Sequence, residues 1–221
     1  MATSGSRDFT LDVAELIEEA YERCGLEVRT GYDAKSARRS LNIMFSEWAN
    51  RGINLWTVKL GTQTLTSGDS DYSLDSSIAD ILEVVVRRSG TDFEVDRISR
   101  SEYQNIPNKA TTGRPSQFYF NRQTTPVINL WPTPENSTDQ LRYYYVQRIE
   151  DADTMVNDVD APFRFLPCMA AGLAYYIAIK RAPDRVQMLK SIYEEEFQRA
   201  ADEDEDRVAL KLTPSIRYLR S

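Results

Sequence analysis

Carboxylates are the only abundant side chains in this sequence that could carry out acid–base chemistry or bind a cation. Two acidic runs stand out, at residues 194–196 and 202–206. Carboxylate oxygens are ligands that Mg²⁺ and Ca²⁺ prefer, so either run could hold a divalent cation. Blocks of like charge more often form a solvated surface. With 34 Asp and Glu residues in the chain, a nearby pair of carboxylates does not identify a hydrolase site.

The other common catalytic side chains are absent or unsuitable. The chain has no histidine, which excludes Ser-His-Asp and Cys-His catalysis and most zinc sites. Cys24 and Cys168 lie in apolar helical patterns, where a free thiol packs like a small hydrophobic side chain. We expect both to be buried and reduced; a bridge between them stays an alternative, because the sequence gives no distance. No glycine-rich phosphate loop is present.

Arginine and tyrosine side chains in the middle of the chain could contact phosphates or bases. Four arginines flank two predicted strands and could bind phosphates, but we favour pairing with the acidic residues among them. The arginines are Arg87, Arg88, Arg97 and Arg100, and the acids are Glu83, Asp92, Glu94 and Asp96. Residues 143–145 are three tyrosines that could stack bases; in a strand they would instead form one core face and one contact face. The net charge of −7 opposes general binding to nucleic acid.

An uncharged stretch at residues 165–179 must organise the chain. Its alanine and leucine content favours a helix, and a helix that is apolar nearly all round must be buried on most sides. It is shorter than the roughly 20 residues that span a bilayer. We therefore expect the central helix of a soluble bundle and no membrane segment. The polar first residues predict no signal peptide.

Apolar residues at helical spacing predict three amphipathic helices around this stretch. The first two should begin at the N-caps Thr10 and Asp33 and end at Gly25 and Gly52. The third follows Pro183 and ends in the acidic run.

Residues 54–150 lack a helical pattern longer than two turns and alternate apolar with polar residues instead. This pattern predicts five or six strands, with one helical turn at 99–104. Short strands at short spacing favour a small antiparallel sandwich or a curled sheet. The predicted strands are 55–65, 81–88, 93–98, 114–121, 126–134 and 141–148.

The sequence thus predicts an α+β fold: a discontinuous four-helix bundle (1–53 and 151–207), an inserted antiparallel β domain (54–150) and an extended C-terminal arm (208–221). The arm alternates apolar and basic residues, which suits docking on a partner. Its contact residues would be Leu210, Leu212, Pro214, Ile216, Arg217, Tyr218 and Leu219. Tyr and Arg are enriched at interfaces, so we also expect the β domain to contact a partner through Arg122, Gln123, Tyr143 and Tyr145.

Four groups of segments, in this order, also resemble a known family. The first group is the two helical segments 16–25 and 41–48. The second is residues 101–103, followed by Gly-Arg-Pro at 113–115 and by residues 118–120. The third is Ile-Asn-Leu-Trp-Pro-Thr-Pro at 128–134, and the fourth is residues 172–174 and 193–196 together with the arm. Their order resembles the head-to-tail adaptor proteins of short-tailed bacteriophages, also called tail tubular, gateway or packaged-DNA-stabilising proteins.

The resemblance implies a structural virion protein without enzymatic activity or cofactor. Such proteins form a dodecameric ring at the virion neck that connects the portal to the tail nozzle and continues the DNA channel. The implied partners are other copies of the chain, the portal protein, the nozzle protein and passing double-stranded DNA without sequence readout. Assembly would occur in the host cytoplasm. The arm would bind the portal, and the β-domain residues would contact the tail or a neighbouring copy. The alternative is a carboxylate-dependent hydrolase or a small protein-binding module.

Overall fold

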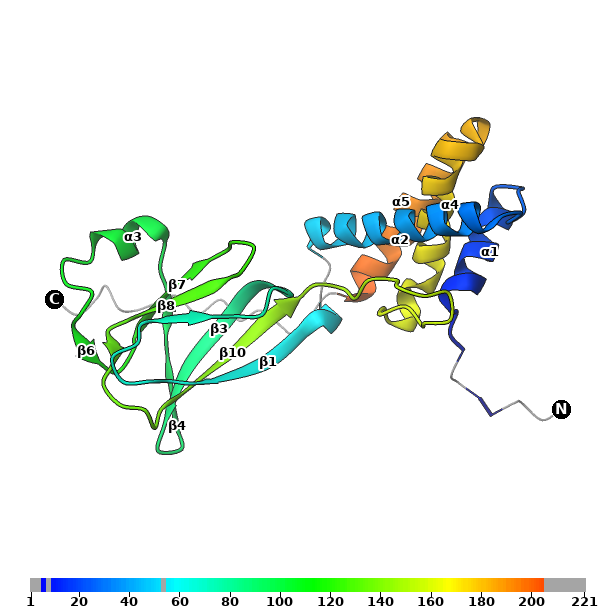
Figure 1. Cartoon of the computed structure of the whole chain (residues 1–221). Helices are drawn as coiled ribbons and strands as arrows, with labels where there is room; N and C mark the ends of the chain where they lie inside the picture. Colours follow the sequence, from blue (N-terminus) through cyan, green and yellow to red (C-terminus); the bar gives the residue numbers. More distant parts are fainter. Residues whose placement is uncertain (1–4, 7–8, 53–54, 205–221) are drawn as a thin grey trace, which may run out of the picture.

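The computed structural model describes residues 5–6, 9–52 and 55–204 and shows a mixed α+β chain (Figure 1). The four long helices form one part of the molecule, and the strands with one short helix form the other. The chain enters the strands after α2 and leaves them after β10, so helices distant in the sequence pack together. The described α-helices are α1 Val13–Arg23, α2 Gly31–Arg51, α3 Arg100–Asn105, α4 Leu166–Arg181 and α5 Val186–Asp204; the short 3₁₀ helices are η1 Leu55–Thr57, η2 Phe163–Phe165 and η3 Pro183–Arg185. The α+β prediction is confirmed.

The first two helices begin at different caps from those predicted. Asp12, not Thr10, caps α1: its carboxylate accepts a hydrogen bond from the Glu15 amide at 2.8 Å. Thr30, not Asp33, caps α2, and the Asp33 carboxylate accepts from the Thr30 amide in return. Each pair is a capping box. The predicted cap Asp33 is the box partner of the observed cap Thr30. Before α1, Thr10 and Asp12 both have side chains able to cap, and the sequence pattern did not decide which one begins the helix.

The α4 helix is the centre of the helical part, as predicted. It contacts α1, α2 and α5, and Pro167 lies in its first turn, where proline is tolerated. In Figure 1, α2 lies across α4. The α4 residues that are buried in the helical core are Leu166, Cys168, Met169, Ala170, Ala171, Gly172, Leu173, Ala174, Ile177 and Ala178.

A buried polar chain joins α2 to α5. The Trp48 indole donates to the Tyr193 hydroxyl at 2.9 Å, and that hydroxyl donates to Glu47 at 2.6 Å. Burial, followed by the hydrogen bond to Glu47, raises the pKa of Tyr193, so the hydroxyl stays a donor. Arg51 then pairs with Glu194 at 2.7 Å and lies 4.2 Å from the ring centroid of Phe197. The polar groups are thus satisfied within the helical part.

Gly172 marks the closest approach of α4 to its neighbours. A Cβ atom there would lie 2.5 Å from the Met44 sulfur and 2.7 Å from the Tyr193 ring. We expect Gly172→Ala to lower the free energy of unfolding by about 1–3 kcal/mol, since overpacking outweighs alanine's better helix propensity. Urea unfolding measures this. Gly31→Ala is the control, because a Cβ there meets nothing within 4 Å; equal stability of the two variants would contradict the close packing.

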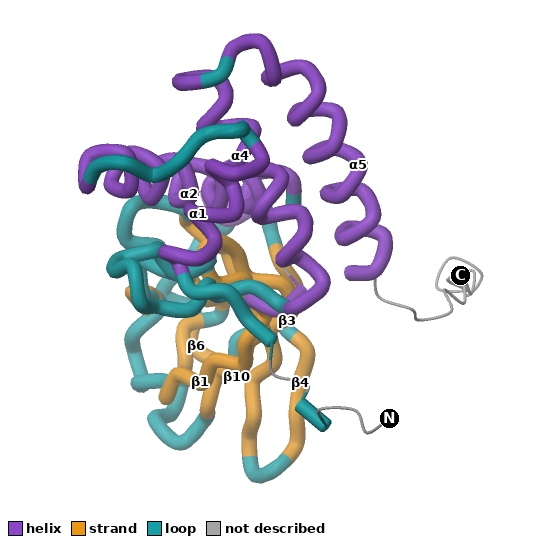
Figure 2. The backbone as a smooth tube through the Cα atoms, turned by 90° about the vertical axis from the view of Figure 1, so that its right-hand side faces the viewer, coloured by secondary structure: helices purple, strands orange, loops and turns teal. Residues whose placement is uncertain are grey.

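The strands form two four-stranded sheets and one small pair. The sheet orders are β1-β10-β3-β4 and β2-β8-β7-β5, and β6 pairs with β9. Buried side chains from both large sheets form one hydrophobic core, separate from the helical core; Figure 2 shows the strands below the helices. The strands are β1 Val58–Thr64, β2 Asp71–Ser73, β3 Ile78–Arg88, β4 Thr91–Glu94, β5 Asp96–Arg97, β6 Thr112–Gly113, β7 Gln117–Asn121, β8 Val127–Trp131, β9 Thr133–Pro134 and β10 Gln140–Gln147.

The structure corrects three details of the predicted β domain. The pairing is not wholly antiparallel, because β5 runs parallel to β7 and β6 runs parallel to β9. The predicted strand 93–98 is split: β4 pairs with β3 in one sheet and β5 pairs with β7 in the other. The strand β2 lies between the predicted strands 55–65 and 81–88 and was missed. Alternation along the sequence shows which face a residue takes, but it does not show which sheet a strand joins.

Candidate interaction surfaces

The carboxylate runs that could have held a cation are occupied by ion pairs. Glu194 pairs with Arg51, and Glu195 and Glu196 both pair with Arg199. The Arg51 hydrogen bond lowers the pKa of Glu194. Of the run 202–206, the structure describes residues 202–204: Asp202 accepts a hydrogen bond from Gln198, and Asp204 is buried against Arg164. Within the described residues, no three acidic or cysteine side chains are grouped as metal ligands would be.

Both thiols are buried and unbonded to each other, as predicted. The Cys24 thiol donates to the carbonyl oxygen of Ala174 at 3.1 Å. Burial raises the pKa of both thiols, so they stay protonated near neutral pH. Since the thiolate is the nucleophile, these cysteines contribute to packing.

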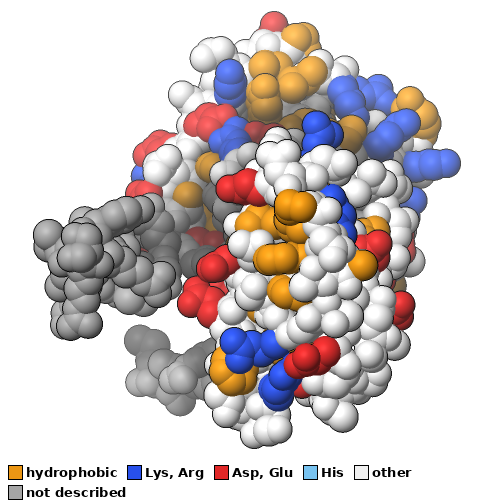
Figure 3. All heavy atoms as spheres, turned by 90° about the vertical axis from the view of Figure 1, so that its left-hand side faces the viewer, with side chains coloured by type: hydrophobic (Ala, Val, Ile, Leu, Met, Phe, Trp, Pro, Cys, Tyr) orange, Lys and Arg blue, Asp and Glu red, His pale blue; other side chains and the backbone are white. Residues whose placement is uncertain are grey.

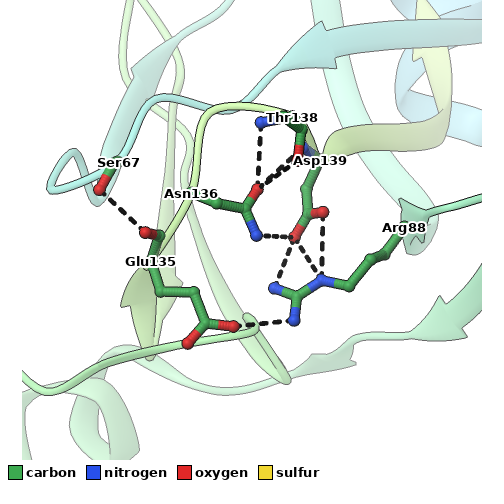
Figure 4. A network of polar contacts seen from close by, with 6 residues as sticks. All are labelled: Ser67, Arg88, Glu135, Asn136, Thr138 and Asp139. Carbon is green, nitrogen blue, oxygen red and sulfur yellow. Dashed lines mark hydrogen bonds and ion pairs between the residues drawn. The ribbon is translucent and has the colours of Figure 1, made fainter.

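A network of polar contacts in the β part stabilises the turn that precedes β10 (Figure 4). The buried Asp139 carboxylate accepts from Arg88 at 2.7 Å, and Arg88 also reaches Glu135 at 2.8 Å. Asn136 accepts from the amides of Thr138 and Asp139. These bonds join the end of β3 to the turn before β10. Because each charge in the cluster has a partner, the arrangement stabilises the fold and leaves no free acid or base.

The other two strand arginines also form ion pairs. Arg87 pairs with Asp92 at 2.6 Å, as predicted, and Arg97 pairs with Asp80 at 3.0 Å. The predicted preference for pairing over phosphate contact therefore holds for three of the four arginines, although Asp80, Glu135 and Asp139 were not among the expected partners. These acids lie far from the arginines in the sequence and reach them only through strand pairing.

Tyr143 was wrongly placed on the contact surface. Only 7% of it is exposed, and its ring covers Gly61 of the paired strand β1, where a Cβ would come within 2.6 Å. The neighbouring Tyr145 is half-buried, with its ring centroid 5.8 Å from that of Tyr143. Leu141 on the same face is also buried, which in retrospect shows that Tyr143 faces the core.

The exposed tyrosine of this strand is Tyr144, which the sequence reasoning did not select. It is 45% exposed and lies directly opposite Leu60 of β1, which is 47% exposed. Leu82 of β3 is also exposed, at an irregularity where β3 shifts its register against β10. Leu60, Leu82 and Tyr144 form what we call the outer sheet face. Which of the three tyrosines is exposed depends on the register of β10 against β1, and the sequence reasoning did not use that register.

The remaining predicted contact residues have different outcomes. Arg122 and Gln123 are exposed at the turn between β7 and β8, and Arg122 lies 3.7 Å from Asp80. The predicted arm residues, Leu210, Leu212, Pro214, Ile216, Arg217, Tyr218 and Leu219, lie outside the described residues.

Two further surfaces lie on the helical part. A groove of about 560 Å³ opens between α1 and the start of α4, with Phe163, Leu166 and Pro167 along it. Four glutamates of α1 also line it, Glu15, Glu18, Glu19 and Glu22, together with Arg23, which pairs with Glu19. We call this the acidic groove. A smaller hollow of about 340 Å³ on α2 includes Lys35, Arg38 and Arg39. Figure 3 shows Lys and Arg side chains gathered at the upper right, over the helical part.

The comparisons with known proteins identify the family. None of the described helices is long and apolar enough to cross a membrane. A search of curated proteins found no match. The family model described as SU10 adaptor protein matches residues 11–215, which includes both the helices and the sheets. Because this match covers nearly the whole sequence, the chain belongs to the SU10 adaptor protein family of phage structural proteins.

Proposed function

We propose that this chain forms a dodecameric ring at the neck of a phage virion, where it connects the portal to the tail nozzle and continues the DNA channel. The observation that carries the proposal is the family match over residues 11–215. The described surface supports it, because exposed apolar side chains occur on both parts of the molecule. Contacts with several proteins at once need such surfaces.

We assign a separate role to each predicted domain. The four long helices, from residues 1–53 and 151–207, act as one bundle that holds the ring together. The inserted residues 54–150 contact a neighbouring copy or the nozzle, through Arg122, Gln123 and the outer sheet face. The arm, residues 208–221, docks on the portal. Two distinct hydrophobic cores support a division between helices and strands.

The charge of the chain suits a channel through which DNA must pass. A net charge of −7 gives the protein little general attraction for DNA, whose binding depends on neutralising phosphates with Lys and Arg. Three of the four strand arginines are held in ion pairs. Double-stranded DNA would therefore pass without sequence readout. The buried reduced thiols agree with assembly in a reducing host cytoplasm.

Native mass measurement of the chain, with and without its portal protein, tests this function. A ring predicts a large assembly of defined mass that includes the portal. A small oligomer that ignores the portal would overturn the proposal. Such an oligomer with hydrolytic turnover would favour a carboxylate-dependent hydrolase, and one without turnover would favour a small protein-binding module.

The turn between β7 and β8 offers a test of the β part. We expect deletion of residues 122–125 to leave the helical circular dichroism unchanged and to weaken assembly, because these residues are exposed and contribute no side chain to either core. A variant with the same four residues replaced by Gly and Ser separates the loss of side chains from the shortening of the turn. Loss of helical signal on deletion would contradict separable domains, and full assembly would contradict the contact.

A further inference from the structure

Two helices of this chain present opposite charges at matching spacing. On α1, the acidic stripe of Glu15, Glu18, Glu19 and Glu22 follows the pattern i, i+3, i+4, i+7. On α2, the basic stripe of Lys35, Arg38 and Arg39 follows i, i+3, i+4, and Asn42 continues it at i+7. Residues at these spacings lie on one face of a helix. The acidic stripe extends about 10 Å along its helix axis and the three basic residues extend about 6 Å, so the basic stripe fits within the length of the acidic one.

Both stripes contain charged side chains that have no ion-pair partner among the described residues. Glu18 and Glu22 are exposed, as are Lys35 and Arg39, and none of the four forms an ion pair with another described residue. Arg38 donates to the Asp153 carbonyl rather than to a carboxylate. Nearby, burial lowers the pKa of Lys180, and the charges of Arg39 and Arg181 lower it further. Concentrated like charge disfavours the isolated fold, so these stripes indicate a partner.

Each stripe also borders exposed apolar side chains. Phe163 lies along the acidic groove and is 71% exposed, and Leu166 and Pro167 line the same groove. Ile43 lies one turn beyond the basic stripe and is 51% exposed. An apolar centre with a charged rim is the usual composition of a protein interface.

We propose that the acidic groove of one copy receives the basic stripe of the next copy, with Ile43 entering between α1 and α4. This inference rests on the proposed ring and names the contact that would close it. The acidic groove and the hollow on α2 share no residue, so one copy can use both surfaces at once. A contact of this head-to-tail kind forms a ring when the rotation between copies closes.

A second copy fits both surfaces better than DNA does. Double-stranded DNA could meet the basic stripe, but it would be repelled by the four glutamates of the acidic groove. A second copy supplies a surface of opposite charge to each: three basic side chains to the groove, and four glutamates to the basic stripe. Charge complementarity of this kind also guides encounter and suppresses wrong pairings.

Charge reversal on each side tests the contact. One variant carries Lys35→Glu and Arg39→Glu, and the other carries Glu18→Lys and Glu22→Lys. Each variant alone would bring like charges together at every contact between copies, so we expect the concentration for half-assembly to rise by at least about tenfold. A 1:1 mixture restores opposite charges at every contact, and an even-numbered ring closes by alternation. We expect the mixture to assemble, with both variants in equal amount by native mass.

Lys190→Glu with Arg100→Glu is the matched control for the Lys35/Arg39 variant, because it makes the same change in net charge at exposed positions on α5 and α3. The control should assemble as the unsubstituted chain does. The proposed contact is wrong if either reversal variant assembles normally alone, or if the mixture fails to assemble. Neither result affects the proposed ring. Absence of any ring from the unsubstituted chain with its portal would overturn the proposed function itself, which the same mass measurement shows.

Discussion

Leu173→Asp should unfold the helical part at temperatures where the unsubstituted chain remains folded. Leu173 is fully buried on α4, the helix that contacts α1, α2 and α5. An aspartate there would be surrounded by apolar side chains with no cation beside it. An unpaired buried charge costs about 3–5 kcal/mol after relaxation, a large share of the roughly 5–15 kcal/mol that keeps a domain folded.

Thermal unfolding followed by circular dichroism at helical wavelengths measures this effect. Ile179→Asp is the matched control, because Ile179 lies on the same helix but is 52% exposed. The control should melt within a few degrees of the unsubstituted chain, since exposed substitutions usually change stability by less than about 0.5 kcal/mol. If both variants melted alike, α4 would not be the centre of the helical core.

Removal of residues 208–221 should leave a soluble, folded chain that no longer joins the portal. The described end of α5 is held without them, because Asp204 pairs with Arg164 of η2. The removed sequence combines Leu210, Leu212 and Ile216 with basic residues, a composition suited to docking in an apolar groove with an acidic rim. The measurement is co-sedimentation with purified portal protein.

A full-length variant with serine at Leu210, Leu212 and Ile216 separates the loss of apolar contacts from the loss of length. We expect it to bind the portal as poorly as the truncated chain, since ordering a segment without apolar contacts is unfavourable. Full affinity of the truncated chain would refute the proposed role of the arm. A truncated chain that fails to fold would instead show that the arm packs on its own helices.

The amino-acid sequence alone identified the elements whose environment follows from composition. The uncharged stretch 165–179 contains most of α4, because an apolar sequence of that length in water must be covered by other parts of the chain. Helical and alternating periods located the other long helices and most strands. The burial of both cysteines followed from their apolar neighbours.

Only the tertiary structure decided the features that depend on strand register and on partners distant in the sequence. Tyr143 and Tyr144 are adjacent and identical in type, yet one is buried over Gly61 and the other is exposed opposite Leu60. A shift of one residue in register exchanges the two faces of a strand, and local sequence does not fix that register. Likewise, Arg88 reaches Asp139 only because β3 pairs with β10. The acidic groove exists because the start of α4, at Leu166, packs beside α1, which ends far earlier in the chain at Arg23.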